Sequence, residues 1–233
     1  MPGGAHARKG LQREYDVQGE KMEPAVLEAI REVLTTGQEM ARRGLVAGTS
    51  GNCSVRVPDS NIMVITPTSL EYELMLFEDI CVLDMEGKQV EGKLKPSIEI
   101  NMHLAVYNAR PDVNGIVHTH QTMASAVAVT GKPIPPILEE EVFKLLGSVE
   151  VAEYAGPGTT ELAESTVNAL GHRMACLLAH HGVVAVGANI RDALLNADIV
   201  ERAASIYIFS RMVGTPRIVP FMEDDWKARG LEV

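Results

Sequence analysis

The sequence predicts one layered α/β domain in which helices cover the faces of a mixed β-sheet. Segments with helical spacing of apolar residues alternate along the chain with short segments of strand type. Two neighbouring pairs of these strand-type segments are joined by turn residues, as in hairpins. Hairpins give antiparallel neighbours and helical crossovers cover a sheet, so together they predict a mixed sheet rather than a doubly wound parallel one.

The first half of the chain contributes one helix and two hairpins. Apolar residues recur at helical spacing over 23–43, and Gly44 can end this helix. Segment 52–65 alternates, turns at Pro58 and resumes with apolar residues, which predicts a hairpin. A second hairpin is expected over 80–90, with a Glu-Gly pair at its turn.

The second half alternates helices with strands. Pro96-Ser97 begins a helix that is expected to end near Arg110, because a proline follows. Thr159 or Thr160 can cap a later helix that runs to residue 170. The remaining expected elements are a strand over 115–120, a helix over 123–129, a short strand over 147–151, a strand pair or one bent strand over 175–186 and a final amphipathic helix from 189 to about 212.

Length and composition limit the domain organisation and the partners. Residues 1–22 lack periodicity, so we expect a flexible extension before one domain over 23–233. The formal net charge is −10, with 21 Lys and Arg scattered among 31 acids, which argues against a nucleic-acid partner. No apolar stretch reaches the roughly 18 residues that span a bilayer, and no signal-peptide pattern occurs, so we expect a cytoplasmic protein without a membrane partner. Cys53, Cys81 and Cys176 have no metal or disulfide spacing and are expected to be small buried residues.

Two histidines spaced two residues apart are candidate metal ligands. His118 and His120 lie on the strand expected over 115–120, where a period of two places both imidazoles on one face. The alternative is a pair of core histidines satisfied by hydrogen bonds. Because two imidazoles on one face of an apolar strand are costly to bury without partners, the spacing favours one shared metal ion.

A catalytic zinc usually has three protein ligands and one open position. His180 or His181, just before Gly182, can supply the third ligand, and the spacing does not decide between them because adjacent strand residues face opposite ways. Glu99 is the candidate proton carrier beside the metal, the alternative being an ordinary acid at a helix N-terminus. His103, four residues further on, is expected to be structural or to lie behind the site.

Two loops offer groups that bind anions. Segment Gly48-Thr-Ser-Gly-Asn52 joins the first helix to the first hairpin and has the small residues and free N–H groups of an anion nest. Segment Thr66-Pro-Thr-Ser69 ends that hairpin with hydroxyl groups, although a turn held by side-chain-to-backbone bonds is the alternative. Neither loop is specific by itself.

Five motifs in order resemble the class II aldolase/adducin family, over about residues 23–220. The motifs are Gly48-Thr-Ser-Gly-Asn-Cys-Ser54, Thr66-Pro-Thr-Ser69, Pro96-Ser-Ile-Glu99, His118-Thr-His120 and His180-His-Gly182. The resemblance implies an α/β/α sandwich with a largely antiparallel central sheet, and a homotetramer with active sites near subunit interfaces. It also implies reversible cleavage of a ketose 1-phosphate, a sugar phosphate, to dihydroxyacetone phosphate and an aldehyde.

The resemblance also implies a role for each matching residue. In the family, three histidines hold Zn²⁺, which points to His118, His120 and His181 here. Another divalent ion stays an alternative. Glu99 would contact the resting metal and then act as the catalytic proton carrier. The residues implied for binding the substrate phosphate are Thr49, Gly51, Asn52, Thr68, Ser69 and Ser97.

Three departures from the family pattern keep alternatives open. Ile98 stands where many relatives have a second serine, Leu138-Glu-Glu-Glu141 replaces a His-Tyr pair of the family's aldolases, and Arg229-Gly-Leu231 lies where a tyrosine serves the neighbouring site. These departures leave the sugar phosphate unidentified and keep a metal-dependent decarboxylase or epimerase as the alternative. A non-catalytic adducin-like assembly module is the rival from another class, but such modules do not retain the zinc histidines.

Overall fold

The structure is a computed structural model that describes residues 16–17 and 20–220 of the chain. Most of the extension predicted over 1–22 lies outside these residues, as does the Arg229-Gly-Leu231 segment. Within the described part, β1 (Asp16–Val17) and β2 (Glu20–Lys21) form a small antiparallel pair that the sequence analysis did not predict. Among the described residues, no helix is both long and apolar enough to cross a membrane.

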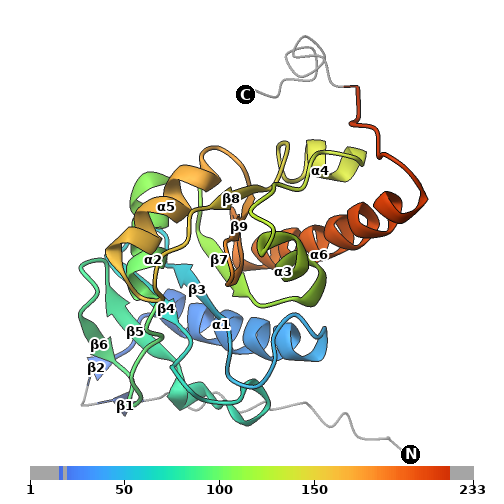
Figure 1. Cartoon of the computed structure of the whole chain (residues 1–233). Coiled ribbons are helices and arrows are strands. Elements are labelled where there is room, and N and C mark those ends of the chain that lie inside the picture. The colour runs from blue at the N-terminus through green and yellow to red at the C-terminus, as the bar shows by residue number, and fades with distance from the viewer. Residues whose placement is uncertain (1–15, 18–19, 221–233) are drawn as a thin grey trace, which may run out of the picture.

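The core of the fold is an eight-stranded mixed sheet, as the sequence predicts (Figure 1). Its strands in spatial order are β6 (Gln89–Glu91), β5 (Cys81–Asp84), β4 (Ile62–Ile65), β3 (Asn52–Arg56), β7 (Gly115–Thr119), β10 (Gly182–Gly187), β9 (Ala175–Leu178) and β8 (Glu150–Ala152). Only β8 and β9 pair in parallel, and every other pair is antiparallel. Both predicted hairpins are therefore confirmed.

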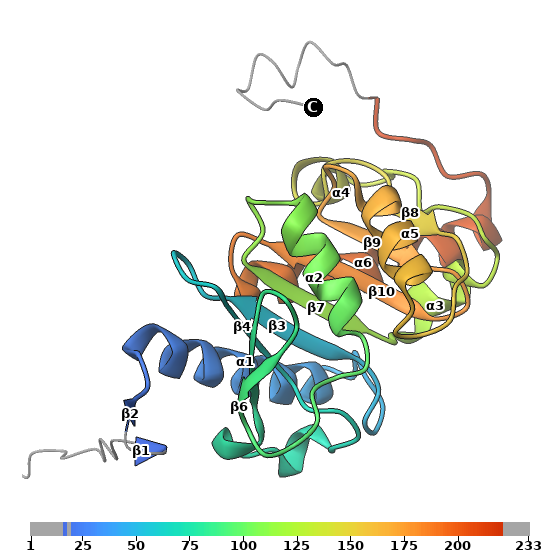
Figure 2. The ribbon, with the colours of Figure 1, turned by 90° about the vertical axis from the view of Figure 1, so that its left-hand side faces the viewer.

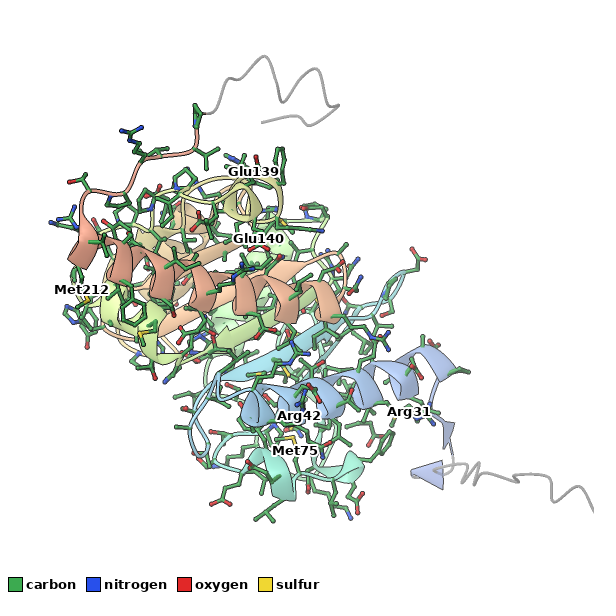
Figure 3. All side chains as sticks on the ribbon, turned by 90° about the vertical axis from the view of Figure 1, so that its right-hand side faces the viewer. Arg31, Arg42, Met75, Glu139, Glu140 and Met212 are labelled. Atoms are coloured by element: carbon green, nitrogen blue, oxygen red, sulfur yellow. The ribbon has the colours of Figure 1, made fainter. Side chains whose placement is uncertain are left out.

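Helices cover both faces of the sheet and make three layers. On one face lie α1 (Pro24–Arg42), α3 (Thr122–Ala128) and α6 (Ile190–Val213), and Figure 3 shows α1 and α6 in front of the sheet. On the other face lie α2 (Ile100–Ala109) and α5 (Thr160–Leu170), which Figure 2 shows in front. Strand residues alternate between the two buried clusters, so Val117 packs under α6 whereas Ile116 belongs to the cluster that α2 and α5 complete.

The helix ends follow the signals predicted from the sequence. Gly44, after α1, has a φ of +69°, the left-handed conformation that ends many helices. The Thr159 hydroxyl accepts a hydrogen bond of 3.2 Å from the Leu162 amide and so caps α5. Cys53, Cys81 and Cys176 are free and buried, as expected.

Short helices are where the structure differs from the sequence prediction. The acidic segment, for which no element was predicted, forms α4 (Glu139–Phe143), and two 3₁₀ helices, η1 (Tyr72–Leu74) and η2 (Phe77–Asp79), follow the first hairpin. Helix α4 is held by Glu141, whose Oε2 accepts bonds of 2.6 and 2.7 Å from the amides of Ile137 and Leu138. One turn has too few residues to show a periodicity.

Candidate metal centre and substrate cleft

Three histidines meet at one end of the central strands. His118 is the fourth residue of β7, His120 follows the end of that strand, and His181 lies in the turn before β10. Because β7 and β10 are antiparallel neighbours, the end of one lies beside the start of the other. The ring centroids are 4.8 Å apart in every pair, and one nitrogen from each ring lies within 4.8 Å of the other two.

The ring nitrogens and carboxylate oxygens that converge at this point can each present a lone pair to a metal ion. His118 Nδ1 donates to the Val183 carbonyl at 2.8 Å, which leaves Nε2 with its lone pair. That Nε2 lies 2.9 Å from His120 Nε2 and 3.1 Å from Glu99 Oε2, while His181 Nε2 lies 3.4 Å from Glu99 Oε1. Acceptors this close repel one another unless a cation or a proton lies between them. Three imidazoles and a carboxylate form a set of ligands that suits a divalent ion such as Zn²⁺.

The pKa values of His120 and Glu99 favour metal binding near neutral pH, whereas the pKa of His118 opposes it. Burial, with the neighbouring His118 and His181, lowers the pKa of His120 to about 3, so its ring stays neutral. Burial opposes a charged Glu99, but His118, His181 and Asn52 outweigh it and hold the pKa of the carboxyl below its ordinary value. Burial also opposes a charged His118, yet the Glu99 carboxylate raises the pKa of His118. A proton therefore competes with a metal ion for this ring.

The structure brings one of the two histidines that the spacing left open, His181, to the cluster. His180 and His181 lie in the turn between β9 and β10 rather than on a strand. His180 has a φ of +57°, and its ring lies 6.0 Å from that of Tyr154, so it faces away from the cluster that His181 joins. The next position has to be glycine, because a Cβ on Gly182 would lie 2.2 Å from the Thr119 carbonyl oxygen.

A cleft of about 270 Å³ opens above the histidines, and no lysine or arginine lines it in the part of the chain that the structure describes. Its walls bring together nine of the ten predicted site residues, and the tenth, His118, is fully buried beneath them. The lining residues are Thr49, Ser50, Gly51, Asn52, Pro67, Thr68, Ser69, Ser97, Ile98, Glu99, His120, Pro157 and His181. Their hydroxyls and amides suit an anion held by neutral donors.

Backbone geometry places the polar groups of this cleft. Gly51 has a φ of +77°, and a Cβ there would lie 2.6 Å from the His118 carbonyl oxygen, so only glycine lets the loop approach β7 this closely. Ser97 is 4% exposed, and its hydroxyl accepts a 3.3 Å bond from the Glu99 amide just before α2. Glu99 is thus the N-cap residue of α2, one position before the first turn expected for it.

Asn52 lines the cleft, but both of its side-chain atoms are engaged behind it. Its Nδ2 donates to Glu99 Oε2 at 2.7 Å, and its Oδ1 lies 2.5 Å from His103 Nε2. The phosphate contact expected for Asn52 stays a prediction, because these bonds point its amide at the carboxylate instead. Ser54 and Tyr107, which the sequence analysis missed, extend the same group of side chains.

Of the residues that depart from the family pattern, some line the cleft and others do not. Ile98 is 64% exposed and lines the cleft, where it presents an apolar side chain beside Ser97. The acids Glu139 to Glu141 do not line the cleft: Glu141 is buried, and Glu140 pairs with Arg202 at 2.9 Å. In the part of the chain that the structure describes, α4 therefore contributes no acidic group to the wall of the cleft.

Known proteins share this sequence pattern and this fold. Residues 31–208 match the family model described as Class II Aldolase and Adducin N-terminal domain. An L-fuculose phosphate aldolase of Escherichia coli O6:H1 is 42% identical over 87% of this chain and 92% of that protein. A 5-deoxy-D-ribulose 1-phosphate aldolase of Bacillus thuringiensis is 35% identical over 86% and 94%. A solved L-fuculose 1-phosphate aldolase superposes with a TM-score of 0.81 at 34% identity, over 86% of this chain and 93% of that one.

Proposed function

The chain belongs to the class II aldolase and adducin family, and we propose that it is a metal-dependent aldolase. It cleaves a ketose 1-phosphate reversibly to dihydroxyacetone phosphate and an aldehyde. We further propose Zn²⁺ as the ion, a homotetramer as the assembly and the cytoplasm as the location. The observation that carries the activity is the convergence of three imidazoles and one carboxylate beneath a cleft lined with neutral hydrogen-bond donors.

His118, His120 and His181 would hold the ion through their converging nitrogens, with Glu99 as a fourth ligand in the resting site. A divalent ion bound there acts as a Lewis acid that polarises the ketose oxygens and stabilises negative charge beside the carbonyl. Thr49, Gly51, Thr68, Ser69 and Ser97 would bind the substrate phosphate through hydroxyls and backbone N–H groups, with Asn52 as the predicted sixth contact.

Glu99 is the proton carrier of this scheme. Its Oε1 has no hydrogen-bond partner in the described part of the chain, whereas Asn52 holds its Oε2. In the cleavage direction the carboxylate accepts the proton of the substrate hydroxyl. At the same time the bond breaks between the carbon that bears this hydroxyl and the carbon next to the ketone. The carboxylate then returns the proton to the carbanionic carbon of dihydroxyacetone phosphate, so one proton moves and none is lost.

Metal analysis of the purified protein, followed by a screen of ketose 1-phosphates for release of dihydroxyacetone phosphate, tests the proposal. We expect about one divalent ion per chain, because the site offers three histidine ligands and a fourth position that the Glu99 carboxylate can occupy at rest. The decarboxylase alternative predicts turnover of an unphosphorylated carboxylate, and the epimerase alternative predicts inversion at one carbon of the sugar. Neither predicts release of dihydroxyacetone phosphate. An adducin-like assembly module predicts no bound metal and no turnover of either substrate class.

A further inference from the structure

A chain of buried side chains continues from Glu99 into the space between α2 and β3. Helix α2 and its N-cap contribute Glu99, His103 and Tyr107, and strand β3 contributes Asn52 and Ser54. Successive links are 2.7 Å from Asn52 Nδ2 to Glu99, 2.5 Å from His103 Nε2 to Asn52 Oδ1, 2.6 Å from Ser54 Oγ to His103 Nδ1 and 2.8 Å from Tyr107 Oη to Ser54 Oγ. All five residues are at most 4% exposed.

The chemistry of each group fixes the direction of these hydrogen bonds. A carboxylate only accepts, so Asn52 must donate through Nδ2 and accept through Oδ1. His103 therefore donates through Nε2, and its Nδ1 accepts the Ser54 proton. Tyr107 then donates to the Ser54 oxygen. Every donor points toward Glu99, and hydrogen bonds aligned in this way strengthen one another.

The protonation states of the chain agree with this direction. Burial lowers the pKa of His103 to about 3, although Glu99 opposes the shift, so the ring is neutral and carries one proton. Burial raises the pKa of Tyr107 above its ordinary value, so its hydroxyl keeps its proton as a donor.

We propose that His103 is a positioning residue for the proton carrier: through Asn52 it fixes one carboxylate oxygen of Glu99 and leaves the other for the substrate. The inference rests on the proposed function, since it concerns the residue that moves the proton in that reaction. His103 contacts neither the histidine cluster nor the cleft. Its effect must therefore pass through Asn52, and a carboxylate misplaced by about 1 Å can lose about 10²-fold in rate.

A matched pair of variants tests this role. The side-chain amide of His103→Gln can present its NH₂ where His103 Nε2 donates to Asn52, whereas His103→Met has similar length and no donor. We expect metal content to match the wild type in both. For His103→Gln, kcat should stay within about threefold of the wild type, and for His103→Met it should fall by about 10²-fold with little change in KM. Equal kcat values for folded, metal-loaded Gln and Met variants would overturn the positioning role.

Nitrogen NMR of the imidazoles gives a readout that does not depend on activity. In metal-loaded wild-type protein labelled at histidine nitrogen, the signal that His103→Gln removes should show a protonated Nε2 and an acceptor Nδ1, unchanged between pH 5 and 8. A proton on Nδ1, or titration in that range, would overturn the direction of the chain. A wild type that releases no dihydroxyacetone phosphate from any ketose 1-phosphate would instead refute the proposed function, and the NMR result would still stand.

Discussion

Replacing Glu99 by Gln would remove the proposed proton carrier with little change of shape. Oε2 accepts a 2.7 Å bond from Asn52, and the amide oxygen of glutamine can accept the same bond. The amide NH₂ then takes the place of Oε1, which no hydrogen bond holds in the described part of the chain. The variant keeps the bonds behind the site but offers the substrate a donor where the wild type offers a base.

The magnitude of the loss follows from the size of general acid–base catalysis. A positioned proton carrier contributes roughly 10²–10⁴-fold, so kcat should fall by about that factor, or about 3–5 kcal/mol of transition-state stabilisation. KM should change little, because the hydroxyl-bearing loops that line the cleft are untouched. The three imidazoles remain, so most of the metal should also remain.

The assay is steady-state release of dihydroxyacetone phosphate by metal-loaded protein, with metal content and thermal unfolding measured on the same samples. Glu28→Gln is the matched control, because Glu28 is an exposed acid on α1 whose one ion pair among the described residues is with Arg31, at 3.3 Å. Its kcat should equal that of the wild type. A folded, metal-loaded Glu99→Gln variant with a kcat within about tenfold of the wild type would remove Glu99 from the mechanism, since the carrier's contribution is at least about 10²-fold.

Other substitutions test the metal, the anion site, the helix end and the pH dependence. His118→Ala should lose the divalent ion by elemental analysis, and full occupancy in a triple His-to-Ala variant would show that the ligands are wrong. Asn52→Ala should lower kcat for phosphorylated and unphosphorylated analogues alike if it orients Glu99, whereas a rise in KM for the phosphorylated sugar alone would favour the phosphate contact. Arg56→Met should lower the free energy of unfolding in urea by about 1–3 kcal/mol, because the guanidinium donates to four carbonyls between residues 107 and 113, and an unchanged value would refute this. His103 binds its proton more weakly when folded, so stability is lost as pH falls from its unfolded pKa of about 6.5 towards about 3. Between these pH values, the free energy of unfolding of His103→Gln should fall less steeply than that of the wild type, by about 1.4 kcal/mol per pH unit. Equal slopes for the variant and the wild type would contradict this.

Local signals in the sequence were sufficient for the long elements and for the histidine pair. The spacing of His118 and His120 placed both rings on one side of β7, and the structure brings them together. Spacing alone could not choose His181, which the family resemblance implied, over His180, because the turn contains a left-handed residue that a strand-based argument cannot anticipate. The partners of Asn52 were also out of reach, because they lie 47 and 51 residues away on another element.

The contact between α2 and β3 was nevertheless encoded in two spacings that fit each other. Glu99, His103 and Tyr107 are four residues apart at and along α2, which is a rise of about 6 Å per step at 1.5 Å per residue. Asn52, Ser54 and Arg56 alternate along β3 with a step of about 6.6–6.8 Å.

Because the two steps are nearly equal, the side chains of helix and strand alternate along the contact. Their order is Glu99, Asn52, His103, Ser54, Tyr107 and Arg56. The Arg56 guanidinium lies 5.2 Å from the centroid of the Tyr107 ring. A shift of β3 by one residue would turn Cys53 and Val55 toward α2 and break every link at once. The register of β3 in the sheet therefore also places Asn52 where it orients the Glu99 carboxylate.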